Sequence, residues 1–135
     1  MAWRFTLLLM IAALCAGINA WINPQRPLWS QDFLAEGEVS VAQVLALQDV
    51  LFVDARTRVQ FEEGSIPGAI LLNEEKWDGL VENLLMVWDP EQPVVVFCDS
   101  LECNASHAVA ERLLAEYGLE NVQVLKGGWQ SWNER

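Results

Sequence analysis

Basic residues and histidine are scarce in this sequence. Its 135 residues include eight Lys and Arg and one His against nineteen Asp and Glu, a formal net charge of −11. This balance disfavours binding to nucleic acid and recruitment by an anionic lipid surface, and it is also typical of plain solubility. Internal repeats and low-complexity tracts are missing too. With about half of its residues apolar, a chain of this length predicts one domain.

A long apolar run occurs only at the N-terminus. Residues 5–18 are almost all apolar and follow Arg4, and counting on to Ile22 gives about 18 residues, near the lower limit for crossing a bilayer. We expect an uncleaved single-pass anchor, with the rest of the chain extracytoplasmic (periplasmic) by the positive-inside rule. A cleaved signal followed by secretion stays open, because "INA" before Trp21 loosely fits a cleavage site.

The remaining chain divides into a linker and a regular domain. Residues 1–22 form the anchor or signal, and residues 23–39 have prolines and no sustained period, which indicates a linker. From residue 40 to 135, strand and helix patterns alternate. Strands are predicted at 50–55, 69–73, 93–98 and 122–127, and helices at 40–48, 59–63, 76–88 and 107–118, before a last helix with two tryptophans. The fold class is therefore α/β, a small parallel sheet with helices on both faces.

Cys98 ends the most apolar of these strands, which we expect to be central. Ligands of such sheets bind beyond the carboxyl ends of the strands. The loop after Cys98 leads into a helix, whose first N–H groups and dipole stabilise a thiolate or a bound anion. Cys98 is therefore a candidate nucleophile.

Two longer segments resemble the rhodanese-like family. "FVDARTRVQFEEGSIPGAILLN" (52–73) resembles its first signature, with Asp-x-Arg after a strand and then Gly-x-Ile-Pro-Gly-Ala. "VVVFC" and "GLENVQVLKGGWQSW" (118–132) resemble the second. The resemblance covers about residues 40–132 and implies sulfur transfer: Cys98 takes a sulfane sulfur as a persulfide, in a cradle of loop amides, and passes it to a thiol. It further implies structural support from Asp54 and Arg56. We expect no cofactor.

The loop departs from a common family pattern. Leu101, Cys103 and Asn104 stand where that pattern has Gly, Arg and Ser, while Asp99 and Glu102 place negative charge that repels anionic donors such as thiosulfate. The loop resembles that of a subgroup of the family, which has a second cysteine five residues after the first and a serine three residues further on. Cys103 and Ser106 occupy these two positions here. The predicted active-site loop comprises Asp99, Ser100, Leu101, Glu102, Asn104 and Ser106.

Cys103 is the predicted resolving thiol, because a second cysteine near a nucleophile can resolve a persulfide by forming a disulfide. A structural disulfide or a merely buried thiol are the alternatives. A zinc site on Cys98, Cys103 and His107 lacks a fourth ligand, so we predict no metal. His107 is expected at the surface near the helix start.

Two functions stay open. The first is a membrane-tethered sulfurtransferase or thiol/persulfide relay, whose partners are a small sulfur donor, a thiol acceptor and a protein thiol. The second is a non-catalytic binding module with a structural Cys98–Cys103 disulfide. Phosphatase or arsenate-reductase chemistry is disfavoured because no arginine lies between Cys98 and Arg112.

Overall fold

The computed structural model describes residues 10, 37–100 and 103–135. The predicted anchor, apart from Met10, and the predicted linker up to residue 36 lie outside these residues, as do Leu101 and Glu102. No helix within the described ranges has both the length and the apolar character needed to cross a membrane. The chain divides into two units, Met1–Phe33 and Leu34–Arg135, and the second contains the fold discussed below.

The second unit alternates strands and helices along its length. In chain order the elements are β1 (Glu38–Val39), α2 (Val41–Ala46), β2 (Leu51–Asp54), α3 (Arg58–Glu63), β3 (Ile70–Leu71), η2 (Glu74–Lys76), α4 (Trp77–Val87), β4 (Val94–Phe97), α5 (Ala105–Tyr117), β5 (Val122–Leu125) and α6 (Gly128–Asn133). All pairings between neighbouring strands are parallel, in the order β1-β5-β4-β2-β3. The strand that ends before Cys98 is therefore the central one, as predicted.

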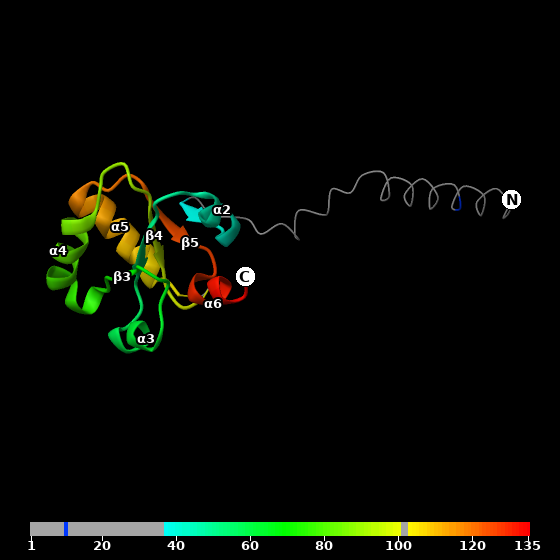
Figure 1. The fold of residues 1–135 in the computed structure, drawn as a ribbon, viewed down its shortest axis with the longest axis horizontal. Helices are drawn as coiled ribbons and strands as arrows, with labels where there is room; N and C mark the ends of the chain where they lie inside the picture. The colour runs from blue at the N-terminus through cyan, green and yellow to red at the C-terminus, as the bar shows by residue number, and fades with distance from the viewer. Residues whose placement is uncertain (1–9, 11–36, 101–102) are drawn as a thin grey trace, which may run out of the picture. The chain divides into compact units, whose positions relative to one another are not determined.

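Two apolar cores lie on opposite faces of this sheet. One core packs α4 and α5 against β2 and β4 through residues such as Leu84 and Leu113. The other packs α2 and α6 against the opposite face through Val44 and Trp132. Figure 1 shows α4 and α5 on one side of the strands and α2 and α6 on the other. Because both faces are covered, β4 is completely buried and its apolar run has no polar alternation.

Local signals explain where several helices begin and end. Ser40 and Thr57 each cap a helix with a reciprocal capping box, to Gln43 and Gln60 respectively. Gly118 ends α5 in the left-handed conformation, which glycine adopts without steric cost. The predicted elements are thus present, with ends shifted by at most two residues.

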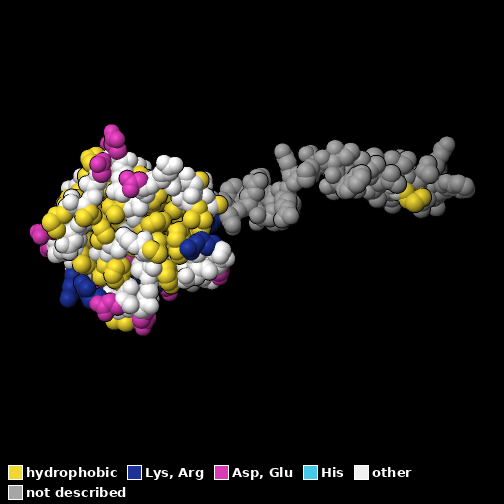
Figure 2. Space-filling view, in the orientation of Figure 1, with side chains coloured by type: hydrophobic (Ala, Val, Ile, Leu, Met, Phe, Trp, Pro, Cys, Tyr) yellow, Lys and Arg dark blue, Asp and Glu magenta, His cyan; other side chains and the backbone are white. Residues whose placement is uncertain are grey.

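Strand β1 was not predicted. It falls at the end of the segment interpreted as a linker, and its two residues pair with Val124 and Leu125 of β5. So short a strand leaves no periodic pattern in the sequence, and only its pairing with β5 defines it. Acidic side chains are scattered over the face of the domain shown in Figure 2 and do not gather in one patch there.

Candidate active site

Cys98 directly follows the central strand and is 2% exposed. Its carbonyl oxygen accepts a hydrogen bond from the amide of Trp129 at 2.7 Å, and that of Asp99 accepts one from Gln130 at 3.0 Å. These two hydrogen bonds hold the start of α6 against the start of the loop that follows β4. Gly128 permits this approach, because a Cβ there would collide with the Cys98 carbonyl and its φ of +51° is left-handed.

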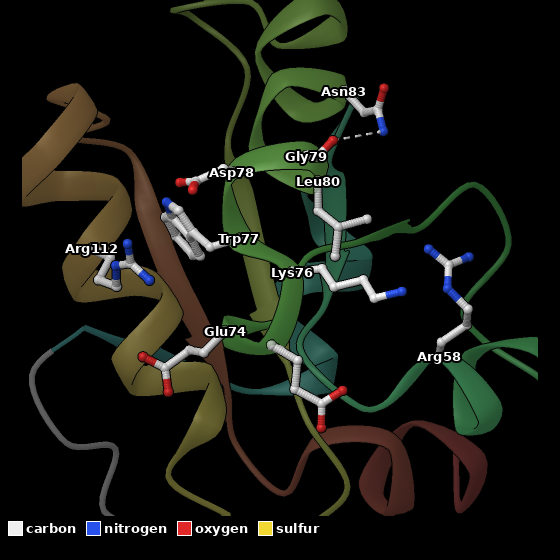
Figure 3. Close-up of a pocket in the computed structure, with 10 residues that line it drawn as sticks. Arg58, Glu74, Lys76, Trp77, Asp78, Gly79, Leu80, Asn83 and Arg112 are labelled. Carbon is white, nitrogen blue, oxygen red and sulfur yellow. Dashed lines mark hydrogen bonds between the residues drawn. The ribbon is translucent and has the colours of Figure 1, made fainter.

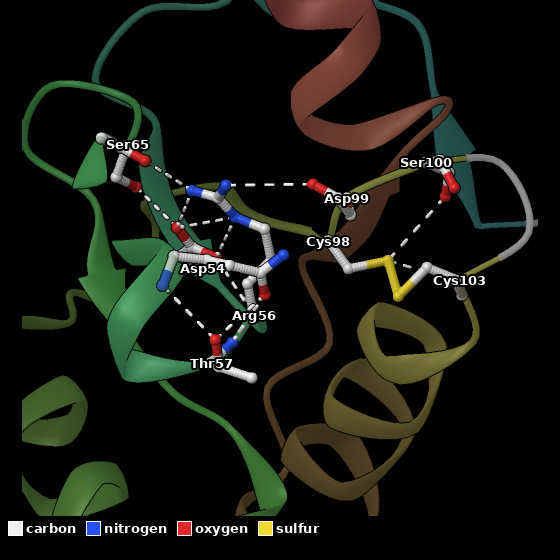
Figure 4. A network of polar contacts seen from close by, with 10 residues as sticks. Asp54, Arg56, Thr57, Ser65, Cys98, Asp99, Ser100 and Cys103 are labelled. Atoms are coloured by element: carbon white, nitrogen blue, oxygen red, sulfur yellow. Dashed lines mark hydrogen bonds and ion pairs between the residues drawn. A yellow bond between two sulfur atoms is a disulfide. The ribbon is translucent and has the colours of Figure 1, made fainter. Parts of the chain in front are cut away.

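Cys98 and Cys103 form a disulfide, with their Cα atoms 6.3 Å apart (Figure 4). The Cys98 sulfur lies 3.2 Å from the carbonyl oxygen of Cys103 and 3.9 Å from that of Ser100. These oxygens can accept a hydrogen bond only from a reduced thiol. The hydroxyl of Ser106, in the first turn of α5, lies 3.5 Å from the same sulfur and can donate to it in either state.

The predicted cradle of loop amides has no counterpart among the hydrogen bonds of the described loop residues. The amide of Cys103 donates to the carbonyl of Ser100 at 3.2 Å rather than to sulfur. Asn104 is the N-cap residue of α5, but its side chain makes no capping hydrogen bond. Within the part of the loop that the structure describes, the Ser106 hydroxyl is the donor that reaches the Cys98 sulfur. Leu101 and Glu102 lie outside it.

Asp54 and Arg56 form a buried ion pair at the end of β2, the strand beside β4. The guanidinium Nη2 lies 2.8 Å from the Asp54 carboxylate, and Nε donates to the other carboxylate oxygen at 3.0 Å. Ser65 donates to Asp54 at 2.7 Å, and Arg56 donates to the carbonyl of Gly64 at 2.7 Å (Figure 4). The pair therefore ties both ends of α3 to the sheet edge.

Arg56 also reaches the loop after Cys98. Its Nη1 lies 4.0 Å from the carboxylate of Asp99, and its guanidinium lies over the Trp129 ring, 4.7 Å from the centroid. One buried cation thus connects the β2 edge, the cysteine loop and α6. This geometry suits a supporting role, since the structure gives Arg56 no contact with either sulfur.

A cavity of about 280 Å³ lies next to the disulfide. Cys103 is among its lining residues, whereas Cys98 is not. Three carboxylates, those of Glu74, Glu75 and Asp99, line it together with Arg56. The other lining residues are Ala55, Thr57, Gln60, Asn73, Ala105 and Val109.

A larger hollow of about 540 Å³ lies over the start of α4 (Figure 3). Its lining includes Glu74 and Glu75, which it shares with the cavity beside Cys103, as well as Arg58, Lys76 and Arg112. Cysteine, serine and histidine do not occur among its lining residues. We therefore place the candidate active site at the disulfide and the cavity beside Cys103, not at this larger hollow.

His107 lies away from the sulfur chemistry. Its Nε2 is 3.4 Å from the Glu38 carboxylate of β1, and its side chain is 42% exposed. No three His, Cys, Asp or Glu side chains group as metal ligands in the described ranges. His107 thus contributes a surface contact between α5 and the edge strand.

The fold and the site define a parallel α/β domain with one cysteine at the end of its central strand and a buried Asp-Arg pair on the strand beside it. The sequence model of the Rhodanese-like domain matches residues 40–135, and the chain belongs to this family. The match covers every described strand and helix after β1.

Curated relatives are named as enzymes of sulfur transfer. The chain is 28% identical over 102 residues to the thiosulfate sulfurtransferase GlpE of Pseudoalteromonas translucida, covering 73% of this chain and 90% of the relative. It is 31% identical over 94 residues to that of Shewanella oneidensis, covering 70% and 86%. A crystal structure of a rhodanese-related protein from Thermoplasma volcanium shares the fold, with a TM-score of 0.56 and 23% identity over 72% of this chain and 90% of that one.

Sequence reasoning missed one side of the site. Asn73, Glu74 and Glu75 line the cavity beside Cys103 but were not among the predicted site residues. They follow β3 after one intervening residue, Leu72, and the carboxyl ends of parallel strands meet at one sheet edge. That rule, applied to every strand rather than to the central one alone, would have found them.

Proposed function

We propose that the domain is a sulfurtransferase or thiol/persulfide relay in which Cys98 carries the sulfane sulfur. The observation that carries the proposal is the position of Cys98 at the end of the central strand of a rhodanese-like domain, with the Ser106 hydroxyl 3.5 Å from its sulfur. An O–H donor there stabilises a thiolate or persulfide anion. The names of the curated relatives support the same chemistry.

The proposed transfer has two steps. With the disulfide reduced, the Cys98 thiolate attacks the sulfane sulfur of the donor, and the donor leaves with the electron pair of the broken bond. The thiolate of an acceptor then attacks the outer sulfur and restores the Cys98 thiolate. Alternatively Cys103 attacks the inner sulfur, which forms the Cys98–Cys103 disulfide and releases hydrosulfide.

Thiosulfate is an unfavourable donor in this proposal. Three carboxylates line the cavity beside Cys103, and Arg56 is already paired with Asp54. A divalent anion entering the cavity is therefore repelled. We expect the donor to be a polysulfide or a persulfidated small thiol, with a small or protein thiol as acceptor.

The test is the intact mass of the full-length chain, purified in a mild nonionic detergent and fully reduced. After treatment with a persulfidated small thiol we expect a gain of one sulfur atom, none in Cys98→Ser, and a longer-lived adduct in Cys103→Ser. A reduced protein that gains no sulfur from thiosulfate, polysulfide or persulfide is not a sulfurtransferase. An unchanged adduct lifetime in Cys103→Ser would remove the resolving role.

The binding-module alternative also has a supporting observation, because the disulfide is formed and Cys98 is buried. A disulfide that persists under mild reduction, together with the absence of sulfur loading, would favour it. The two functions thus give opposite results in one experiment.

We further propose that the N-terminal apolar segment anchors the domain to a membrane, on its extracytoplasmic side. The apolar run of residues 5–18 after Arg4 supports this proposal. Fractionation of a bacterial host tests it: the intact chain should stay with membranes in alkaline carbonate and be cleaved by protease added to spheroplasts. A soluble chain of lower mass would instead indicate a cleaved signal.

A further inference from the structure

We propose that the Cys98–Cys103 disulfide is a site of thiol–disulfide exchange in which an incoming thiol attacks the sulfur of Cys103 and not that of Cys98. An incoming small thiol occupies the cavity, attacks the sulfur of Cys103 and expels Cys98. This activity goes beyond sulfur transfer and does not rest on it, since a chain unable to load sulfur can still react in this way. It makes Cys103 the electrophilic sulfur of the oxidised protein.

Access to the two sulfurs is unequal. Cys98 is 2% exposed and packs with β2, β4 and α5 in the larger core, whereas Cys103 is only partly buried and lines the cavity. A thiolate must contact the sulfur that it attacks. In the oxidised protein the cavity therefore presents Cys103 to an incoming thiol, while Cys98 is buried.

The surroundings of Cys98 suit a leaving group. When the S–S bond breaks, its electron pair goes to the Cys98 sulfur, and the Ser106 hydroxyl at 3.5 Å can donate to the thiolate that forms. The incoming thiolate forms a new S–S bond with Cys103. A second thiol then attacks the mixed disulfide, so that two thiols are oxidised to one disulfide and the protein gains two electrons and two protons as a dithiol.

Charge around the cavity limits which thiols enter. Glu74, Glu75 and Asp99 line it. The one lining cation, Arg56, is bonded to Asp54 and lies 4.0 Å from Asp99, so the carboxylates around the cavity outnumber the cation. Local potential therefore favours a cationic or uncharged thiol over an anionic one. A volume of about 280 Å³ suits a small molecule rather than a folded partner. The inferred substrate class is a small, amine-bearing or neutral thiol.

The first experiment locates the attacked sulfur. The oxidised full-length chain, with Cys15→Ala to remove the third thiol, is mixed with cysteamine and quenched with N-ethylmaleimide, and its peptides are analysed by mass spectrometry. We expect cysteamine on Cys103 and maleimide on Cys98. The reverse labelling, equal labelling of the two cysteines, or no opening of the disulfide would each overturn the proposal.

The second experiment tests the charge preference. Opening rates are compared, per thiolate, for cysteamine, 2-mercaptoethanol and 3-mercaptopropionate. We expect cysteamine to react at least about fivefold faster than 3-mercaptopropionate at low salt. The double variant Glu74→Gln, Glu75→Gln should reduce this ratio.

The matched control is Glu82→Gln, Glu120→Gln, which removes two exposed carboxylates that do not line the cavity. It should leave the ratio close to that of the parent chain. An equal loss in both double variants would assign the preference to overall charge and contradict the role of the cavity. Sulfur loading is not measured in either experiment, so failure of one proposal leaves the other standing.

Discussion

Arg56 connects several segments near the cysteines through one side chain. Its guanidinium bonds to Asp54 and to the Gly64 carbonyl, lies 4.0 Å from Asp99 and stacks over Trp129. A lysine cannot reproduce the two parallel N–H bonds to one carboxylate. The role of Arg56 is therefore to fix the positions of α3, the cysteine loop and α6 relative to one another.

Replacing Arg56 should destabilise the fold strongly. Arg56→Ala leaves the buried Asp54 carboxylate without its cation, which costs about 3–5 kcal/mol in comparable buried pairs. Urea unfolding followed by tryptophan fluorescence measures the loss. Arg58→Ala is the matched control, because its pair with Glu62 is exposed and such pairs contribute about 0.5 kcal/mol or less. Similar losses in both variants would contradict the supporting role.

At the scale of elements, α5 connects the site to the core. Its first turn carries Ser106 beside the Cys98 sulfur, and its later turns pack Val109 and Leu113 into the larger core. Further along, Arg112 stacks over the Trp77 ring of α4 at 3.9 Å and bonds to Glu116 at 2.8 Å. These contacts fix α5 against α4 and so fix the position of Ser106.

The contact between Arg112 and Glu116 predicts a pH dependence. The hydrogen bond from Arg112 lowers the pKa of Glu116 below its usual value near 4.5. Because the folded-state pKa is depressed, the stabilisation is present above pH 4.5 and is lost as pH falls through the lowered pKa. Glu116→Gln should therefore lower the Tm at neutral pH but not at strongly acidic pH. A Tm difference independent of pH, or one matched by Glu120→Gln, would contradict this.

At the scale of the whole domain, two apolar cores and a fully parallel sheet carry the stability. The disulfide closes a loop over a sequence separation of only five residues. Closing so short a loop contributes at most about 2 kcal/mol by the chain-entropy estimate. The fold should therefore persist when the disulfide is reduced.

Reducing the disulfide and measuring the stability of the domain tests this expectation. We expect the reduced full-length chain to keep its far-ultraviolet circular dichroism and to unfold cooperatively at a lower urea concentration, with a loss of about 2 kcal/mol or less. Cys103→Ser should behave like the reduced protein. Unfolding on reduction would mean that the disulfide is essential to the structure, and would favour the binding module over the relay.

Much of the fold follows from local patterns. The run Val94–Phe97 predicted a buried central strand, and the serine at residue 40 predicted the start of a helix, which Ser40 indeed caps. Strand β1 could not be predicted, because its two residues become a strand only through pairing with β5. The cavity beside Cys103 was missed for a related reason, since Glu74 and Glu75 lie more than twenty residues from Cys103 in the sequence.

The sequence by itself determined the α/β alternation, the family and the cysteine at the end of the central strand, because these depend on periodicity and on residues close together in the chain. Tertiary structure alone decided that Cys98 is buried while Cys103 faces a cavity lined by carboxylates. Access to a sulfur and the charge around it depend on segments that meet only after folding. No spacing within the loop contains that information.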